Sequence, residues 1–157
     1  MKLKTFLILL AFGIIGTGVI FFSHSNADNS STSPYSPCYK DGVYHGKSRS
    51  IYIYENFWGK VQLTIKHGMI TNVDFLIIDQ DKNEVFSDTY ERHYAGNNHY
   101  IHQCRNEWNG IQTYPQWLLD KQNIADIDAI TGATWSFNIF KDSVAIALRE
   151  AKDNPKN

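Results

Sequence analysis

A run of small and hydroxyl-bearing residues stands directly before a helical pattern near the C-terminus of the 157-residue chain. These residues could hold a bulky anion, because small side chains let a ligand approach the backbone and hydroxyls offer oxygens. The unpaired N–H groups and the dipole of a helix start favour a phosphate at such a place. A plain loop-to-helix junction with a Thr or Ser cap uses the same residue types. The residues concerned are Asp128, Thr131, Gly132, Ala133, Thr134 and Ser136.

The pattern that follows is that of an amphipathic helix extending to about Lys152. Charged residues such as Asp142, Arg149 and Glu150 fall mostly off its apolar face. The spacing predicts a helix whose first turn holds Thr134 to Ser136. The apolar face consists of Phe137, Phe140, Val144, Ala147 and Leu148.

The run from Asp128 to Thr134 resembles the flavinylation motif of the FMN-binding domain family. That family includes the extracytoplasmic flavin subunits of sodium-translocating NADH:quinone reductase and of related electron-transport complexes. Its motif opens with Asp, continues with two variable residues and closes with Ser/Thr-Gly-Ala-Thr. Asp128 matches the opening Asp, and the run from Thr131 to Thr134 matches the closing four residues without departure.

The resemblance implies a covalent cofactor. In the family, a magnesium-dependent flavin transferase uses FAD to esterify the closing Thr with the phosphate of FMN, and that role would fall on Thr134. Thr131, Gly132 and Ala133 would then line the phosphate end, and Asp128 would brace the turn or engage the metal of the transferase. An Asx-turn or helix cap is an equally open role for Asp128. Ser136 is a second nearby hydroxyl that the motif does not single out.

The start of the domain predicts antiparallel strands. The opening from Asp41 to Gly46 resembles the Asp-Gly-x-Tyr-x-Gly start of the same family, which extends the resemblance over residues 41–152. We expect strands at 51–54, 59–66 and 69–78, with a tight hairpin turn at His67-Gly68. Together with the C-terminal helix, this predicts an α+β domain: a mainly antiparallel sheet with flanking helices.

The middle of the chain carries weaker signals. Residues 79–84 place oxygen ligands at alternate positions, but Glu84 stands where a calcium loop needs Gly, so we expect a solvated turn. Histidines and Cys104 gather between Tyr90 and Trp117 without the spacing of a known metal site, and we predict none. Tyr114-Pro115 predicts a short helix with Pro in its first turn.

The N-terminus predicts export. Two lysines precede an apolar run at 6–22, which is longer than the roughly 7–15 residues of a signal core and shorter than the roughly 20 of a membrane span. Small residues before Asp28 favour cleavage there, although an uncleaved anchor remains open. In both cases the domain lies outside the cytoplasmic membrane. Residues 28–40 predict a flexible tether and 153–157 a polar tail, and Cys38 and Cys104 permit one disulfide.

These features predict an exported flavoprotein that carries electrons through FMN covalently bound to Thr134. The net charge of −1 gives no sign of a nucleic-acid partner, and no nucleophile and base pair indicates a hydrolase. We therefore expect an electron carrier rather than a self-sufficient enzyme. Its partners would be a flavin transferase and membrane or extracytoplasmic redox proteins. Two alternatives remain: an unflavinylated interaction or sensing domain, and a reductase with reversibly bound FMN.

Overall fold

The computed structural model describes residues 39–52 and 54–153. The predicted signal or anchor at 1–27, nearly all of the tether, Cys38 and the residues after 153 lie outside this part. None of the helices within it is long and apolar enough to cross a membrane.

The sheet is an antiparallel meander of four strands. They are β1 (Gly42–Arg49), β2 (Phe57–Lys66), β3 (Met69–Asp79) and β4 (Glu84–Val85), paired in the order β1-β2-β3-β4. Alternate residues of the long strands are buried, so one face of the sheet meets the core. The predicted α+β class with a mainly antiparallel sheet is confirmed.

The β2–β3 connection is the predicted two-residue hairpin turn. His67 and Gly68 both have positive φ angles, of 54° and 73°, as a tight turn that follows the twist of the strands requires. The Asp41 carboxylate accepts a hydrogen bond from the Gly68 N–H at 2.9 Å. The residue before β1 thus helps to hold the β2–β3 turn in place.

The predicted strand at 51–54 is wrong for the described residues of that segment. The chain leaves the sheet at Arg49 and reverses towards β2, with the Ser50 N–H donating to the Phe57 carbonyl at 2.9 Å. The aromatic side chains of this connection do not fill the core, and Tyr54 is 94% exposed. Local β-propensity gives way here because the chain needs a turn between two antiparallel strands.

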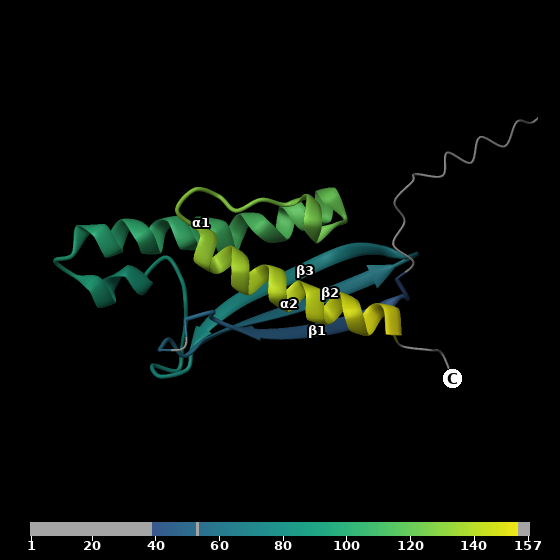
Figure 1. Cartoon of the computed structure of the whole chain (residues 1–157), viewed down its shortest axis with the longest axis horizontal. Helices are drawn as coiled ribbons and strands as arrows, with labels where there is room; N and C mark the ends of the chain where they lie inside the picture. The colour runs from purple at the N-terminus through teal and green to yellow at the C-terminus, as the bar shows by residue number, and fades with distance from the viewer. Residues whose placement is uncertain (1–38, 53, 154–157) are drawn as a thin grey trace, which may run out of the picture. The chain divides into compact units, whose positions relative to one another are not determined.

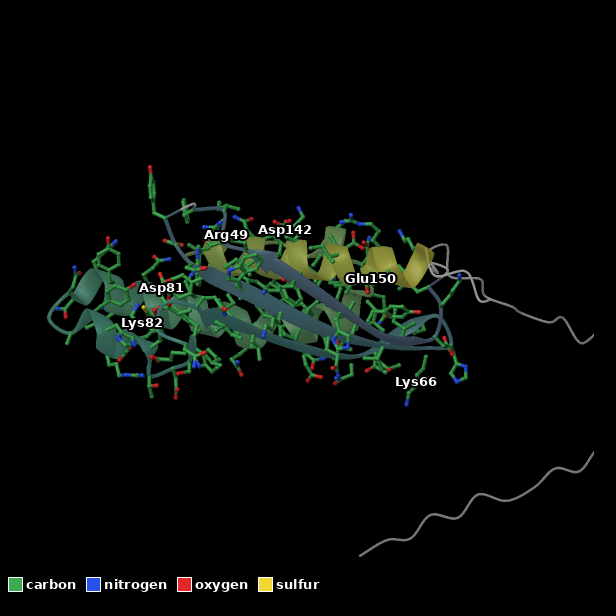
Figure 2. All side chains as sticks on the ribbon, turned by 90° about the horizontal axis from the view of Figure 1, so that it is seen from below. Arg49, Lys66, Asp81, Lys82, Asp142 and Glu150 are labelled. Carbon is green, nitrogen blue, oxygen red and sulfur yellow. The ribbon has the colours of Figure 1, made fainter. Side chains whose placement is uncertain are left out.

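Both long helices cover the buried face of the sheet (Figure 1). They are α1 (Asn98–Lys121) and α2 (Thr134–Asp153), accompanied by the short 3₁₀ turns η1 (Tyr90–Tyr94) and η2 (Ile124–Asp126). Figure 2 shows Lys66 pointing from the sheet away from α2. Within the part of the chain that the structure describes, the helices thus cover one face of the sheet and leave the other open.

The helix predicted to begin near Tyr114 is much longer. It starts at Asn98, where the Asn97 side chain accepts a hydrogen bond from the Tyr100 N–H, and Pro115 lies in its interior. The polar composition of its first half hides it in the sequence. Its buried stripe reveals it: Cys104, Glu107, Gly110, Ile111, Tyr114 and Leu118.

Helix α2 confirms the predicted amphipathic pattern, since every residue of its predicted apolar face is buried. It also approaches β1 very closely. A Cβ atom on Gly46 would lie 1.8 Å from the Ser143 carbonyl oxygen. The Ser48 hydroxyl donates to the Ile139 carbonyl at 2.8 Å and lies 2.9 Å from the Ser143 hydroxyl. Small residues on the strand thus allow backbone to pack almost directly on backbone.

Residues 80–83 form an exposed turn as predicted, but Asp79 before it is buried. Its carboxylate accepts hydrogen bonds from the Tyr90 hydroxyl at 2.5 Å and from Lys82 Nζ at 2.7 Å. Burial alone would raise the pKa of Asp79, but the hydrogen bonds from Lys82 and Tyr90 bring it below its ordinary value. This cluster fixes η1 against the end of β3.

Asp79→Asn is expected to lower the free energy of unfolding at pH 7 by about 1.5–3 kcal/mol, because it removes charge-assisted hydrogen bonds. The lowered pKa means that the ionised carboxylate stabilises the fold above about pH 4, and that this contribution is lost as the pH falls through the pKa of the folded state. Urea unfolding at pH 7 and about pH 3 should therefore show a smaller difference between wild type and variant at the lower pH. Equal differences would contradict this account.

Candidate functional site

The backbone conformation of the motif turn favours glycine at one position. Gly132 has a φ of 81°, in the left-handed region that disfavours other residues. A Cβ atom there would also lie 2.6 Å from Asn106 Nδ2 on α1. The turn is closed by the Ala133 N–H, which donates to the Ile130 carbonyl at 2.8 Å.

Helix α1 holds this turn in place. Gln103 Nε2 donates to the Gly132 carbonyl at 3.1 Å. The Tyr114 hydroxyl donates to the Ala133 carbonyl at 2.9 Å and accepts from the Ile130 N–H at 3.1 Å. Because these partners come from a rigid helix, the start of α2 has a fixed position.

The predicted site residues differ in exposure, and Gly132 is half-buried. Asp128, Thr131 and Thr134 are exposed, and Thr134 is the first residue of α2. Ala133 and Ser136 are fully buried. Thr134 therefore offers an accessible hydroxyl at the helix start, whereas the hydroxyl of Ser136 faces the protein interior.

Glu107 occupies the inner side of the helix start. Its carboxylate accepts hydrogen bonds from the Ser136 N–H at 2.8 Å, the Ser136 hydroxyl at 2.6 Å and Gln103 Nε2 at 2.7 Å. Burial raises the pKa of Glu107, and the hydrogen bonds from Ser136 and Gln103 oppose that rise. A ligand phosphate bound at Thr134 would therefore meet only the outer side of the first turn.

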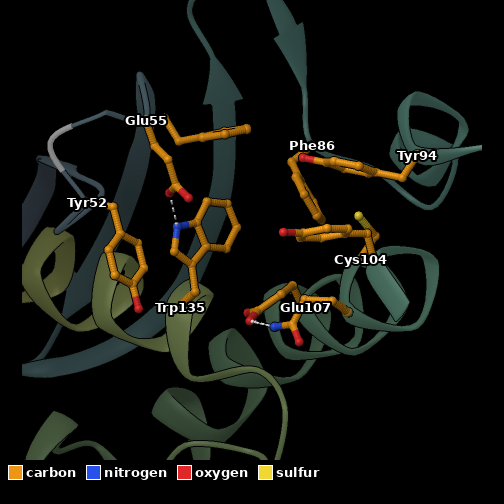
Figure 3. A pocket seen from close by; sticks show the side chains of 10 residues that line it. Tyr52, Glu55, Phe86, Tyr94, Cys104, Glu107 and Trp135 are labelled. Carbon is orange, nitrogen blue, oxygen red and sulfur yellow. Dashed lines mark hydrogen bonds between the residues drawn. The ribbon is translucent and has the colours of Figure 1, made fainter. Parts of the chain in front are cut away.

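An aromatic cavity of about 200 Å³ opens beside this helix start. It lies between α1, the first turn of α2, the β1–β2 connection and Phe86 after β4. Figure 3 shows Trp135 and Tyr52 on one side, with Phe86, Tyr94 and Cys104 on the other. The lining residues are Tyr52, Glu55, Phe57, Phe86, Tyr94, Tyr100, Gln103, Cys104, Glu107 and Trp135.

Trp135 forms a fixed wall of the cavity. Its indole N–H donates to the Glu55 carboxylate at 2.9 Å and to the Ser50 hydroxyl at 3.1 Å. The ring packs edge-on against Phe57, with centroids 5.1 Å apart and planes at 90°, and lies 5.4 Å from Phe86. Contacts on several sides thus hold the indole plane in one orientation.

The opposite wall contains a stacked tyrosine pair. The rings of Tyr94 and Tyr100 are 5.1 Å apart with planes at 20°. Cys104 lies beside them, and burial raises the pKa of its thiol. The thiol is therefore favoured over the thiolate, which lowers its reactivity. Cys38, with which the sequence permits a disulfide, lies outside the described residues.

The shape and lining of the cavity suit a flat aromatic ligand. Six of the ten lining side chains are aromatic, and such rings stack on planar heterocycles. The volume is below the roughly 300–1,000 Å³ of a pocket that encloses a whole small molecule, so the cavity fits a ring system better than an entire nucleotide. The accessible Thr134 hydroxyl stands one residue from Trp135, which suits FMN with its phosphate outside and its ring inside.

Several residues of this site do not emerge from the sequence. Glu107 and Gln103 belong to a helix that the sequence shows only in part, and Glu55 directly follows the segment predicted as a strand. One signal was available: Glu107 is the only charged residue on the stripe that runs from Cys104 to Leu118 at helical spacing.

The histidines of the middle segment do not converge on a metal site. His93 Nε2 lies 2.9 Å from the Glu84 carboxylate, which also pairs with Arg92. Among residues 39–52 and 54–152, no three His, Cys, Asp or Glu side chains come together to hold an ion.

The chain belongs to the FMN-binding domain family, whose sequence profile matches residues 56–149, more than half of its length. Within that class, it is a flavin-binding protein with FMN as its cofactor. No curated protein matches the sequence.

Two solved structures are similar to this chain. A crystal structure of a Clostridium perfringens protein is 22% identical and has a TM-score of 0.54, with 73% of this chain and 90% of that chain covered. A solution NMR structure of a Clostridium thermocellum protein is also 22% identical, with a TM-score of 0.42 and coverage of 75% and 96%. The first of these supports the fold.

Proposed function

We propose that this protein is an electron carrier outside the cytoplasmic membrane, with FMN joined by a phosphoester to Thr134. The observation that carries this proposal is the exposed Thr134 hydroxyl, which stands one residue before a tryptophan that walls an aromatic cavity. The phosphate would be attached at the start of α2, and the ring would enter the cavity beside Trp135.

Attachment requires a transferase that brings FAD to this hydroxyl. The Thr134 oxygen forms a bond to the flavin-side phosphorus, the pyrophosphate bond breaks, AMP leaves and the hydroxyl proton is released. Thr134 can be reached for this step because it is exposed. Asp128 is exposed as well, and we propose that it contacts the magnesium ion of the transferase.

Bound FMN supplies the redox chemistry. The chain holds the motif turn rigid through Gln103 and Tyr114, offers aromatic faces to the ring and excludes water from part of it. A covalent bond suits an exported protein, because a cofactor that dissociated outside the cytoplasm would be lost. The two lysines ahead of the apolar run at 6–22, which predict export, support this location.

The test is whether flavin stays on the denatured protein. The domain, co-expressed with a flavin transferase, should be yellow, keep its colour after acid precipitation and gain the mass of one FMN. A yellow protein that releases its flavin on denaturation would favour reversible binding. A colourless protein, alongside a control protein that the same transferase modifies, would favour an interaction or sensing domain.

A further inference from the structure

The described lining of the aromatic cavity is one-sided in charge. It contains two carboxylates, Glu55 and Glu107, and no Lys, Arg or His. The positive charge of Lys82 works to lower the pKa of Tyr94 in the cavity wall, but Lys82 is itself paired with Asp79 at 2.7 Å. The charged side chains that line the cavity would therefore oppose added negative charge on a ligand there.

The two carboxylates are held in place on different elements. Glu107 projects from α1, is 3% exposed and is bound by Ser136 and Gln103. Glu55 comes from the β1–β2 connection and accepts hydrogen bonds from the Trp135 indole and the Ser50 hydroxyl. In Figure 3 the Glu55 carboxylate lies at the N–H edge of the Trp135 indole, and Glu107 is drawn lower in the view. A ring seated against Trp135 in this cavity would thus lie close to both carboxylates.

We propose that Glu55 and Glu107 lower the midpoint potential of the flavin, so that only an electron donor of low potential reduces it. This inference rests on the proposed function, because it requires the FMN ring in this cavity. Both residues are positioning and charge-setting groups that take no part in bond making.

The physical reason is repulsion between like charges in a poorly hydrated space. Reduction brings two electrons from the donor and draws protons from water. Any negative charge that those protons do not cancel lies beside the carboxylates. Charges in a buried site are screened less than charges at the surface. The buried Glu107 should therefore have a larger effect than Glu55, which is partly exposed.

The experiment compares midpoint potentials of the flavin-loaded protein at pH 8. Burial raises the pKa of Glu107, but the hydrogen bonds that it accepts from Ser136 and Gln103 favour the ionised carboxylate, and a high pH favours it further. The variants are Glu107→Gln, Glu55→Gln and Glu150→Gln. Gln keeps the size of the side chain and an oxygen that accepts hydrogen bonds. Glu150 provides a matched control, because it is exposed on α2 and does not line the cavity. Intact mass confirms one FMN on each protein before its potential is measured.

We expect Glu107→Gln to shift the balance about tenfold towards reduced flavin, which raises a two-electron midpoint potential by about 30 mV. Glu55→Gln should shift it less and in the same direction, and Glu150→Gln should leave it unchanged. A purely structural role for the carboxylates would leave the potential unchanged in the first two variants. Unchanged or lowered potentials in both, on proteins that carry FMN, would overturn the inference. Absence of the FMN mass from wild type would instead overturn the proposed function.

Discussion

Thr134→Ala is expected to abolish covalent flavin attachment and leave the fold intact. The substitution removes the accessible hydroxyl that starts α2, and without it no phosphoester can form at this position. The side chain is exposed, so its loss should change the free energy of unfolding by no more than about 0.5 kcal/mol. Intact mass after co-expression with a flavin transferase should show the FMN adduct in wild type and none in the variant.

Thr71→Ala is the control, because it removes an exposed threonine hydroxyl that lies outside the motif turn. It should retain the adduct. Ser136 is a poorer control, since its hydroxyl is fully buried and bonded to Glu107, so its replacement would disturb the helix start. A full FMN adduct on Thr134→Ala would place the attachment elsewhere and remove the basis for the proposed phosphoester.

The parts of this fold that the sequence predicts are those specified by local signals. The His67-Gly68 turn follows from two residues with positive φ between alternating strands, and α2 follows from apolar residues at helical spacing. The motif turn is equally local, because its positive φ falls on Gly132, which adopts that conformation without strain. Such features depend on a few neighbouring residues and therefore survive without tertiary information.

The site itself depends on contacts between distant segments. Glu107 resembles a surface residue in sequence, and only the docking of α1 on the motif turn, 29 positions away, buries it against Ser136. Trp135 likewise forms a hydrogen bond with Glu55, which lies 80 positions earlier in the sequence. The sequence contains many aromatic residues, but it does not indicate which of them face one cavity. The charge of the site was therefore absent from the sequence-based prediction.

Gly46→Ala is expected to destabilise the domain by about 3 kcal/mol or more, at the upper end of the range for overpacked cores. The added methyl group would meet the Ser143 carbonyl oxygen at 1.8 Å and the Ala147 nitrogen at 3.1 Å, both backbone atoms of α2. A backbone cannot swing aside as a side chain can, so the whole helix must move away from β1. Urea unfolding should show a midpoint well below that of wild type.

Gly96→Ala isolates the effect of close packing from that of glycine replacement in general. A Cβ atom at Gly96 meets no atom within 4 Å, and only its φ of 87° opposes the change, which costs about 1–2 kcal/mol. Gly46 lies within a strand, where alanine would otherwise be preferred by about 0.5–1 kcal/mol. The sign of the Gly46→Ala effect therefore depends on α2. A Gly46→Ala protein as stable as wild type would show that the helix does not lie this close to the sheet.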